Sequence, residues 1–123
     1  MSAASIGLAA LQYGQDRSPF LSPKRVAELL GVTMSELAGL IGVARNTLAA
    51  KAGARKVDAA LSPVVRILAM AGEMAGDEQR AAIWFKHQPI PGWAGKTAYD
   101  LVHEGKADKV LAYLEAVRSG VYA

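Results

Sequence analysis

Residues 84–123 read WFKHQPIPGWAGKTAYDLVHEGKADKVLAYLEAVRSGVYA, and their spacing indicates how the second half of the chain folds. Prolines and glycines are so dense at positions 89–95 that no regular element is expected there. Thr97 follows, with Asp100 three residues later, which is the spacing of a capping box at a helix start. Gly105 is placed to end that helix, because glycine readily adopts the left-handed conformation of a helix end. The stretch therefore predicts a loop followed by a short helix.

A further helix is predicted toward the end of the same stretch. Val110, Leu114 and Val117 recur at the spacing of one helix face. Gly120 is placed to end this helix, and residues 121–123 form a short tail with one aromatic side chain. An aromatic side chain at a chain end buries nothing unless it docks, whereas most chain ends simply fray. The tail is therefore a candidate binding element, with a frayed end as the alternative.

The stretch resembles the toxin-binding domain of the Xre/MbcA/ParS antitoxins, and it is most similar to the ParS type. The family pattern is a tryptophan near a helix end, a Pro/Gly loop, a Gly-x-Thr helix start, a leucine-rich helix pair and a Gly-Val-Tyr/Phe-Ala-like tail. The pattern falls here on Trp84, residues 89–95, Gly95-Lys96-Thr97, Leu101-Val102, Gly105 and Gly120-Val121-Tyr122-Ala123. One position departs, because the family usually has proline after the threonine and this chain has Ala98. The resemblance covers residues 77–123 well and the whole chain loosely.

The resemblance implies a non-enzymatic antitoxin that neutralises a RES-domain toxin, which consumes NAD as a phosphorylase or an ADP-ribosyltransferase. By resemblance, the tail enters the NAD pocket of the toxin and excludes the dinucleotide, and the antitoxin pairs with itself inside a toxin–antitoxin hetero-oligomer. The expected toxin-binding residues are Trp93, Lys96, Thr97, Arg118, Ser119, Gly120, Val121, Tyr122 and Ala123. For Trp93, an exposed interface anchor and a core cap over Trp84 both remain open.

The first half of the chain has the pattern of a helix-turn-helix. Ser22-Pro23 is a helix start, and Thr33 with Glu36 forms a second capping box. Gly42 is placed at the turn, where a positive φ is needed, and residues 43–52 are expected to form the next helix. We therefore expect an all-α protein with an N-terminal arm at residues 1–21, an Xre-like helix-turn-helix at 22–60 and a toxin-binding module at 61–123.

DNA binding is the natural use of such a module. Residues 42–48, GVARNTL, resemble the Gly-Val-Ser-Arg-x-Thr-Ile run of Xre repressors, but Ala44 replaces the usual capping residue. Up to residue 60 seven cations face four acids, and residues 45–56 hold four cations and no acid, which favours an anionic partner such as operator DNA. The DNA-binding candidates are Arg45, Asn46, Thr47, Lys51, Arg55 and Lys56. A helical scaffold that has lost DNA binding is the alternative.

The middle of the chain links these two modules. Residues 57–61 are interpreted as a connection, and Ser62-Pro63 as another helix start. The helix that follows is apolar nearly all round up to Met70, which predicts burial between two modules or in a homodimer. Met34, Met70 and Met74 are interpreted as core or interface filler.

Composition argues against several other classes. The 123 residues are 52% hydrophobic with a net charge of +3, enough for one compact domain or two small helical modules. There is no cysteine, which excludes disulfides and agrees with a reducing cytoplasm. We find no signal-peptide pattern and no apolar run near the ~20 residues that span a bilayer, so we expect a cytoplasmic protein with no membrane partner.

Enzymatic function has little support in the sequence. The two histidines stand apart from any acidic cluster at ligand spacing, so neither a metal site nor a catalytic residue is expected. Residues 92–97, GWAGKT, lack both the first glycine and the preceding strand of a phosphate-binding loop. We therefore expect no enzyme and no cofactor. The alternative to an antitoxin is an Xre-like DNA-binding transcriptional regulator without a toxin partner.

Overall fold

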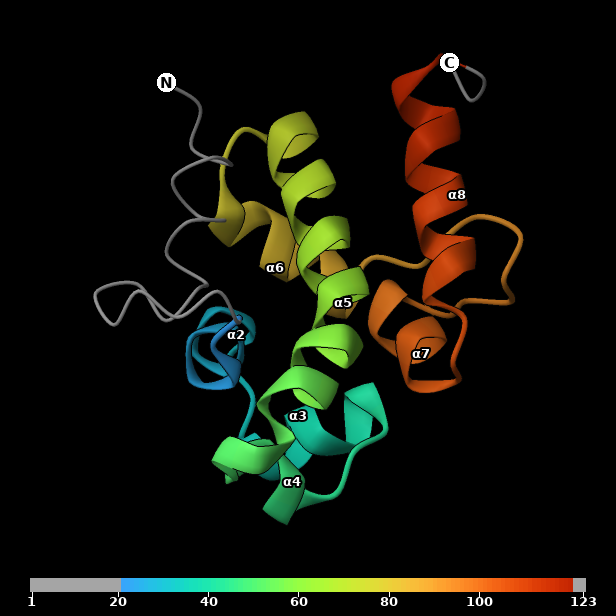
Figure 1. The fold of residues 1–123 in the computed structure, drawn as a ribbon. Helices are drawn as coiled ribbons and strands as arrows, with labels where there is room; N and C mark the ends of the chain where they lie inside the picture. Colours follow the sequence, from blue (N-terminus) through green and yellow to red (C-terminus); the bar gives the residue numbers. More distant parts are fainter. Residues whose placement is uncertain (1–20, 121–123) are drawn as a thin grey trace.

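The computed structural model describes residues 21–120 of the chain. Residues 1–20 of the predicted arm and the tail residues Val121, Tyr122 and Ala123 lie outside that part. The described residues form α2 (Pro23–Leu30), α3 (Met34–Ile41), α4 (Arg45–Ala49), the 3₁₀ helix η2 (Lys51–Gly53), α5 (Ala54–Ala75), α6 (Glu78–His87), α7 (Ala98–His103) and α8 (Ala107–Arg118) (Figure 1). The expected all-α class is confirmed for this part of the chain.

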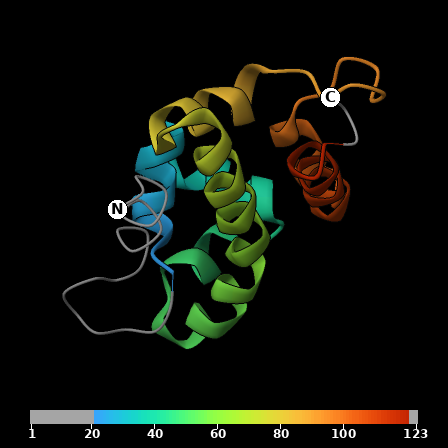
Figure 2. The ribbon, with the colours of Figure 1, turned by 90° about the horizontal axis from the view of Figure 1, so that it is seen from above.

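The long helix α5 lies at the centre of the molecule and joins its two sides. It packs against α2, α4, α6 and α8. Figure 2 shows α5 between α2 and α8, with α6 and α7 completing the arrangement. Contacts of α2 with α6 and of α3 with α7 also cross the molecule. The buried side chains therefore form one continuous core and not two separate ones.

Four of the described helices begin at a residue whose side chain caps the helix. Both expected capping boxes are present, at Thr33 with Glu36 and at Thr97 with Asp100. The Thr97 Oγ1 accepts from the Asp100 N–H at 3.2 Å, and the Thr97 N–H donates to Asp100 Oδ2 at 3.0 Å. Ser22 caps α2 and Asp77 caps α6 through a side-chain oxygen that accepts from the backbone N–H three residues later. Each such cap stabilises its helix by about 1 kcal/mol.

The prediction of a connection at residues 57–61 is wrong, because α5 runs unbroken through it with Pro63 in the helix interior. A proline there costs about 3 kcal/mol. Against that cost, Val57, Leu61, Val64 and Leu68 recur on one face of α5 and are at most 3% exposed. Burying each of these side chains contributes about 1.5–3 kcal/mol, so tertiary packing outweighs the local penalty.

The prediction of one helix over residues 43–52 is also wrong. α4 covers only Arg45–Ala49, and Ala50 is extended with φ −84° and ψ 134°. The reason lies three residues later, because a Cβ at Gly53 would lie 2.7 Å from the carbonyl oxygen of Thr47. The chain therefore leaves the helix at Ala50 and returns across α4, an approach that only glycine permits at this position.

The apolar helix that motivated the expected homodimer is buried within a single chain. Val64 and Ile67 are fully buried, and Val65 and Leu68 are 3% exposed. This surface is covered by the other helices, so it does not by itself call for a second copy. In residues 21–120 no single helix is long and apolar enough to cross a membrane; Lys51–Ala75 with Glu78–His87 meets that test only as a pair bent by 114°.

Candidate functional site

The loop that joins α6 to α7 is closed on itself by its backbone. The Ile90 N–H donates to the Lys96 carbonyl at 2.8 Å, and the Lys96 N–H donates to the Trp93 carbonyl at 3.0 Å. Pro89 and Thr97 form an isolated antiparallel bridge at its base. The Ile90 side chain is 2% exposed and anchors the loop in the core. The loop at residues 88–97 is therefore a fixed projection, held at its base by one buried side chain.

The tip of this loop has an unusual backbone. Ala94 has φ 54°, the only positive φ of a non-glycine residue among those described, between Gly92 at 87° and Gly95 at 84°. The left-handed conformation costs a residue with a Cβ roughly 1 kcal/mol. Ala94 is exposed, so no burial of its own side chain offsets that cost. Strain of this kind gathers at binding and catalytic segments.

Trp93 and Lys96 meet two further side chains beside the loop. The Lys106 ammonium lies 5.6 Å from the centroid of the Trp93 ring. Lys96 Nζ lies 2.8 Å from Glu104 Oε2, and Lys106 Nζ lies 3.2 Å from Glu104 Oε1. Hydrogen bonds from Lys96 and then Lys106 hold the pKa of the Glu104 carboxyl below its usual value. Trp93 is partly buried against the core. It is therefore neither a fully exposed interface anchor nor a fully buried core cap.

The remaining described toxin-binding candidates lie at the far end of α8. Arg118 Nη2 lies 2.6 Å from Glu115 Oε2, and its Nη1 lies 3.9 Å from Glu73 Oε2 on α5. The Ser119 hydroxyl donates to the Ala116 carbonyl at 3.0 Å, and Gly120 ends the helix with φ 86°. Because Trp93 packs at Lys106, before the start of α8, about 18 Å of helix separates the two groups of candidates.

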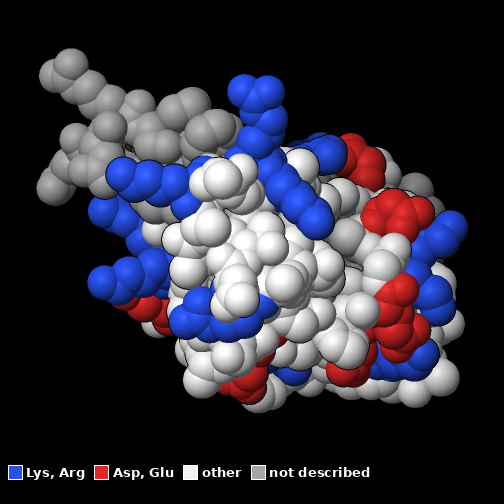
Figure 3. Space-filling view, turned by 60° about the horizontal axis from the view of Figure 1, so that its bottom comes forward, with Lys and Arg blue, Asp and Glu red and all other residues white. Residues whose placement is uncertain are grey.

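The DNA-binding candidates gather around α4. Arg45, Asn46, Lys51, Arg55 and Lys56 are exposed. Thr47 is half-buried where Gly53 approaches it. In the view from below (Figure 3), Lys and Arg side chains dominate one side of the face, whereas Asp and Glu lie mostly toward the other. Within residues 21–120, the four cations Arg45, Lys51, Arg55 and Lys56 form no ion pair, and we call them the basic surface.

A comparison with family models matches residues 70–120 to the antitoxin Xre/MbcA/ParS C-terminal toxin-binding domain. Residues 70–120 are therefore similar to the toxin-binding domain of the Xre/MbcA/ParS antitoxins. Searches of curated proteins and of solved structures find no match. The resemblance expected from the sequence is thus confirmed for residues 70–120, which run from the end of α5 through α8. The basic surface lies outside the matched segment.

The matched segment contains an apolar groove that was not predicted from the sequence. The groove has a volume of about 220 Å³ and lies between α5, α6 and α8. Its lining includes Ala71, Met74 and Ala75 from α5, Trp84 from α6, and Tyr113 and Val117 from α8. Local spacing could place Tyr113 beside Val117 on α8, but nothing in the sequence indicates that α5 and α8 lie side by side. We call this site the α5–α8 groove.

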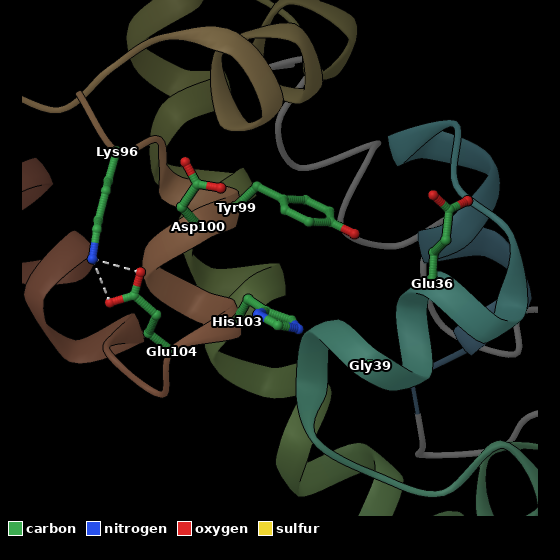
Figure 4. A pocket seen from close by; sticks show the side chains of 7 residues that line it. All are labelled: Glu36, Gly39, Lys96, Tyr99, Asp100, His103 and Glu104. Atoms are coloured by element: carbon green, nitrogen blue, oxygen red, sulfur yellow. Dashed lines mark hydrogen bonds and ion pairs between the residues drawn. The ribbon is translucent and has the colours of Figure 1, made fainter.

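A second, polar groove lies where the toxin-binding domain meets α3. It has a volume of about 490 Å³ and is lined by Glu36 and Gly39 from α3, by Lys96, and by side chains of α7 with Glu104 (Figure 4). The Tyr99 hydroxyl points across it toward Glu36. Burial first, and then the negative charges of Glu36 and Asp100, raise the pKa of Tyr99.

The carboxylates of this polar groove are already engaged. Glu36 and Asp100 accept from backbone N–H groups in the two capping boxes, and Glu104 binds Lys96. Hydrogen bonds from Thr33 also hold the pKa of Glu36 below its usual value. Among the described residues no group of three or more histidine, aspartate or glutamate side chains could hold a metal ion.

Proposed function

We propose that this protein is a non-enzymatic antitoxin that binds and inhibits a RES-domain toxin, an enzyme that consumes NAD. The observation that carries the proposal is the match of residues 70–120 to a toxin-binding domain. That match supports a toxin as the partner. The RES class of the toxin, and its chemistry as an ADP-ribosyltransferase or NAD phosphorylase, come from the resemblance of the loop and tail sequences described above.

We propose that inhibition comes from the tail, residues 121–123, which blocks the NAD site of the toxin. Consecutive Cα atoms are 3.8 Å apart, so the Tyr122 backbone lies within about 8 Å of Gly120. The Arg118 ion pair with Glu73 ties the end of α8 to α5. Residues 121–123 therefore follow directly after a helix end that is held to α5. Helix surfaces supply most of the binding area, and the tail supplies the blocking group.

The experiment is to co-express the protein with the product of the adjacent gene and to purify the pair through a tag on the toxin. Co-purification together with loss of NAD turnover by the toxin is the expected result. Failure of the two proteins to associate would contradict the proposal. Association without loss of NAD turnover would contradict the inhibitory role alone.

We further propose that α3, the turn at Gly42 and α4 act as an Xre-like helix-turn-helix that binds operator DNA and represses the protein's own operon. The exposed cations of the basic surface support phosphate contacts. Exposed Arg45 and Asn46 have side chains that can read guanine and adenine. α4 ends at Ala49, so few other side chains of this helix reach bases. The same surface would serve a DNA-binding regulator without a toxin, which the co-expression experiment distinguishes.

A homodimer within the toxin–antitoxin complex remains part of the proposal. It would present two copies of the DNA-binding module, as symmetric operators require. Because the apolar face of α5 is buried, the dimer would have to use a different surface. Sedimentation of the protein alone and in complex measures its oligomeric state; a single antitoxin chain in both samples would contradict this part.

A further inference from the structure

We propose that the α5–α8 groove is the site where the toxin inserts an apolar side chain, and that this contact anchors the complex. The inference rests on the proposed function, since it names a binding site for the toxin. It differs from the tail contact in chemistry and in role. The tail inhibits, whereas the groove supplies affinity.

The chemistry of the groove selects an apolar occupant. Its walls carry Met74, Trp84 and Val117, and Tyr113 contributes a ring. A polar or charged group entering such a site would lose its hydration without gaining enough hydrogen bonds. Methionine and aromatic side chains adapt to and bury the apolar anchors of protein partners.

The groove is already formed in this structure, and small side chains on α5 keep it open among the described residues. Ala71 and Ala75 place small side chains on α5 opposite the larger ones of α6 and α8, which leaves the hollow unfilled. Ala71 and Leu114 are 5% and 3% exposed, so the floor is part of the core. The Arg118–Glu73 ion pair joins α8 to α5 and places charge beside the apolar lining. An apolar centre with a polar rim is the usual arrangement of a protein–protein interface.

Met74 supplies a second observation. It is 40% exposed and, among the described residues, only Ile83 is another large hydrophobic side chain with comparable exposure. Met74 lines the groove, whereas Ile83 faces a different hollow between α2 and α6. A partner seated in the groove would cover Met74. The two residues therefore form a matched pair, one inside the proposed contact and one outside it.

The position of the groove favours the toxin over a second copy of this chain. Every lining residue lies between positions 71 and 117, within the matched toxin-binding domain. Val117 lies three residues before Gly120, about 5 Å along the helix. A toxin that binds the residues directly after Gly120 would therefore approach the groove. A second copy seated there would obstruct that approach.

The test compares Met74→Glu with Ile83→Glu in the full chain, by measuring the Kd for the RES toxin. Both changes add one charge at an exposed apolar position. We expect Met74→Glu to weaken binding at least about tenfold, because the charge would be desolvated by the incoming side chain, and Ile83→Glu to change it less than about twofold. Circular dichroism confirms that each variant is folded. Equal Kd values for Met74→Glu and the unaltered protein would overturn the inference.

Labelling with 5-fluorotryptophan gives a readout that needs no destabilising variant. The chain has two tryptophans, and Trp93→Phe assigns their ¹⁹F resonances. The Trp84 resonance should shift when unlabelled toxin is added to the labelled antitoxin; an unshifted resonance in a formed complex would overturn the inference.

Two outcomes separate this inference from the proposed function. If the unaltered protein does not bind the toxin, the proposed function fails. If it binds, but Met74→Glu only dissociates an antitoxin dimer in sedimentation and leaves the toxin Kd unchanged, the groove joins two copies and the inference alone fails.

Discussion

Lys96 Nζ lies 2.8 Å from Glu104 Oε2, so the residue before the N-cap of α7 is bonded to the residue just after the helix. Lys106 binds the same carboxylate and also lies over the ring of Trp93. Through Glu104, the loop at residues 88–97, the end of α7 and the start of α8 form one connected unit. This connection positions Trp93 without burying it fully.

The first prediction follows from the lowered pKa of Glu104. A carboxyl group whose pKa falls on folding adds stability above its unfolded pKa, about 4.3 for glutamate. That stability is lost as the pH falls through the lower folded pKa. Glu104→Gln should therefore unfold at a lower temperature than the unaltered protein at pH 7, and the difference should shrink below about pH 4. Thermal unfolding across this pH range, with Glu28→Gln as an exposed control, measures the effect; a difference that grew toward low pH would refute the assigned cause.

The second prediction concerns the tail. Deleting residues 121–123 should leave a complex that still forms, because the helices keep their contact area, while the toxin regains NAD turnover. Tyr122→Ala should restore part of that turnover. Pull-down and an NAD-consumption assay on the same sample measure the two effects. Arg80→Ala, at an exposed site on α6, is the control. Full inhibition by the truncated protein in an intact complex would show that the tail is not the blocking group.

The third prediction concerns DNA. Replacing Arg45, Lys51 and Arg55 together by alanine should strongly weaken binding to the operon's own promoter fragment, and Arg45→Ala alone should weaken it less. If each cation binds one phosphate, the triple change should lower the slope of log K against log salt by roughly 3, since each contact contributes about 0.9. Arg80→Ala again serves as the control. Unchanged binding by the triple variant would assign DNA binding to a different surface.

The fourth prediction uses Gly39 within α3 and Gly42, the residue that ends it. A Cβ at Gly39 would meet nothing within 4 Å, so Gly39→Ala should stabilise the helix by about 0.5–1 kcal/mol. Gly42 also has open space but holds φ at 75°, so Gly42→Ala should destabilise the protein by about 1 kcal/mol. Thermal unfolding should thus move in opposite directions for the two variants. Stabilisation by both would indicate that the turn at Gly42 relaxes.

Gly39 also lines the groove between α3 and α7, which gives its variant a second use. A stabilised Gly39→Ala protein that binds toxin and DNA normally would show that this groove is not needed for either partner. A loss of one activity in the stabilised protein would locate that partner at the groove.

The elements that could be predicted depend on short-range spacing. Thr33 with Glu36, and Thr97 with Asp100, are three residues apart, and a capping box needs only that separation and a free helix end. Gly31, Gly42 and Gly105 end their segments because a positive φ is a local property. The family pattern could be recognised for the same reason, since the loop, the caps and the tail motif are contiguous in residues 84–123.

The parts that could not be predicted depend on contacts between distant residues. Pro63 reads locally as a helix start, yet it lies within α5 because the stripe from Val57 to Leu68 is buried by other helices. α4 is short because Gly53 approaches Thr47.

The sequence by itself determined the helical class, most of the helix starts, the loop before α7 and the similarity of its C-terminal segment to the antitoxin toxin-binding domain. Only the tertiary structure decided that Met74, Trp84 and Tyr113 share one groove, and that Trp93 and Arg118 lie at opposite ends of α8. Spacing fixes which side chains share a helix face, because a helix repeats every 3.6 residues. It does not fix which faces meet, because that depends on how all the helices bury their apolar surfaces together.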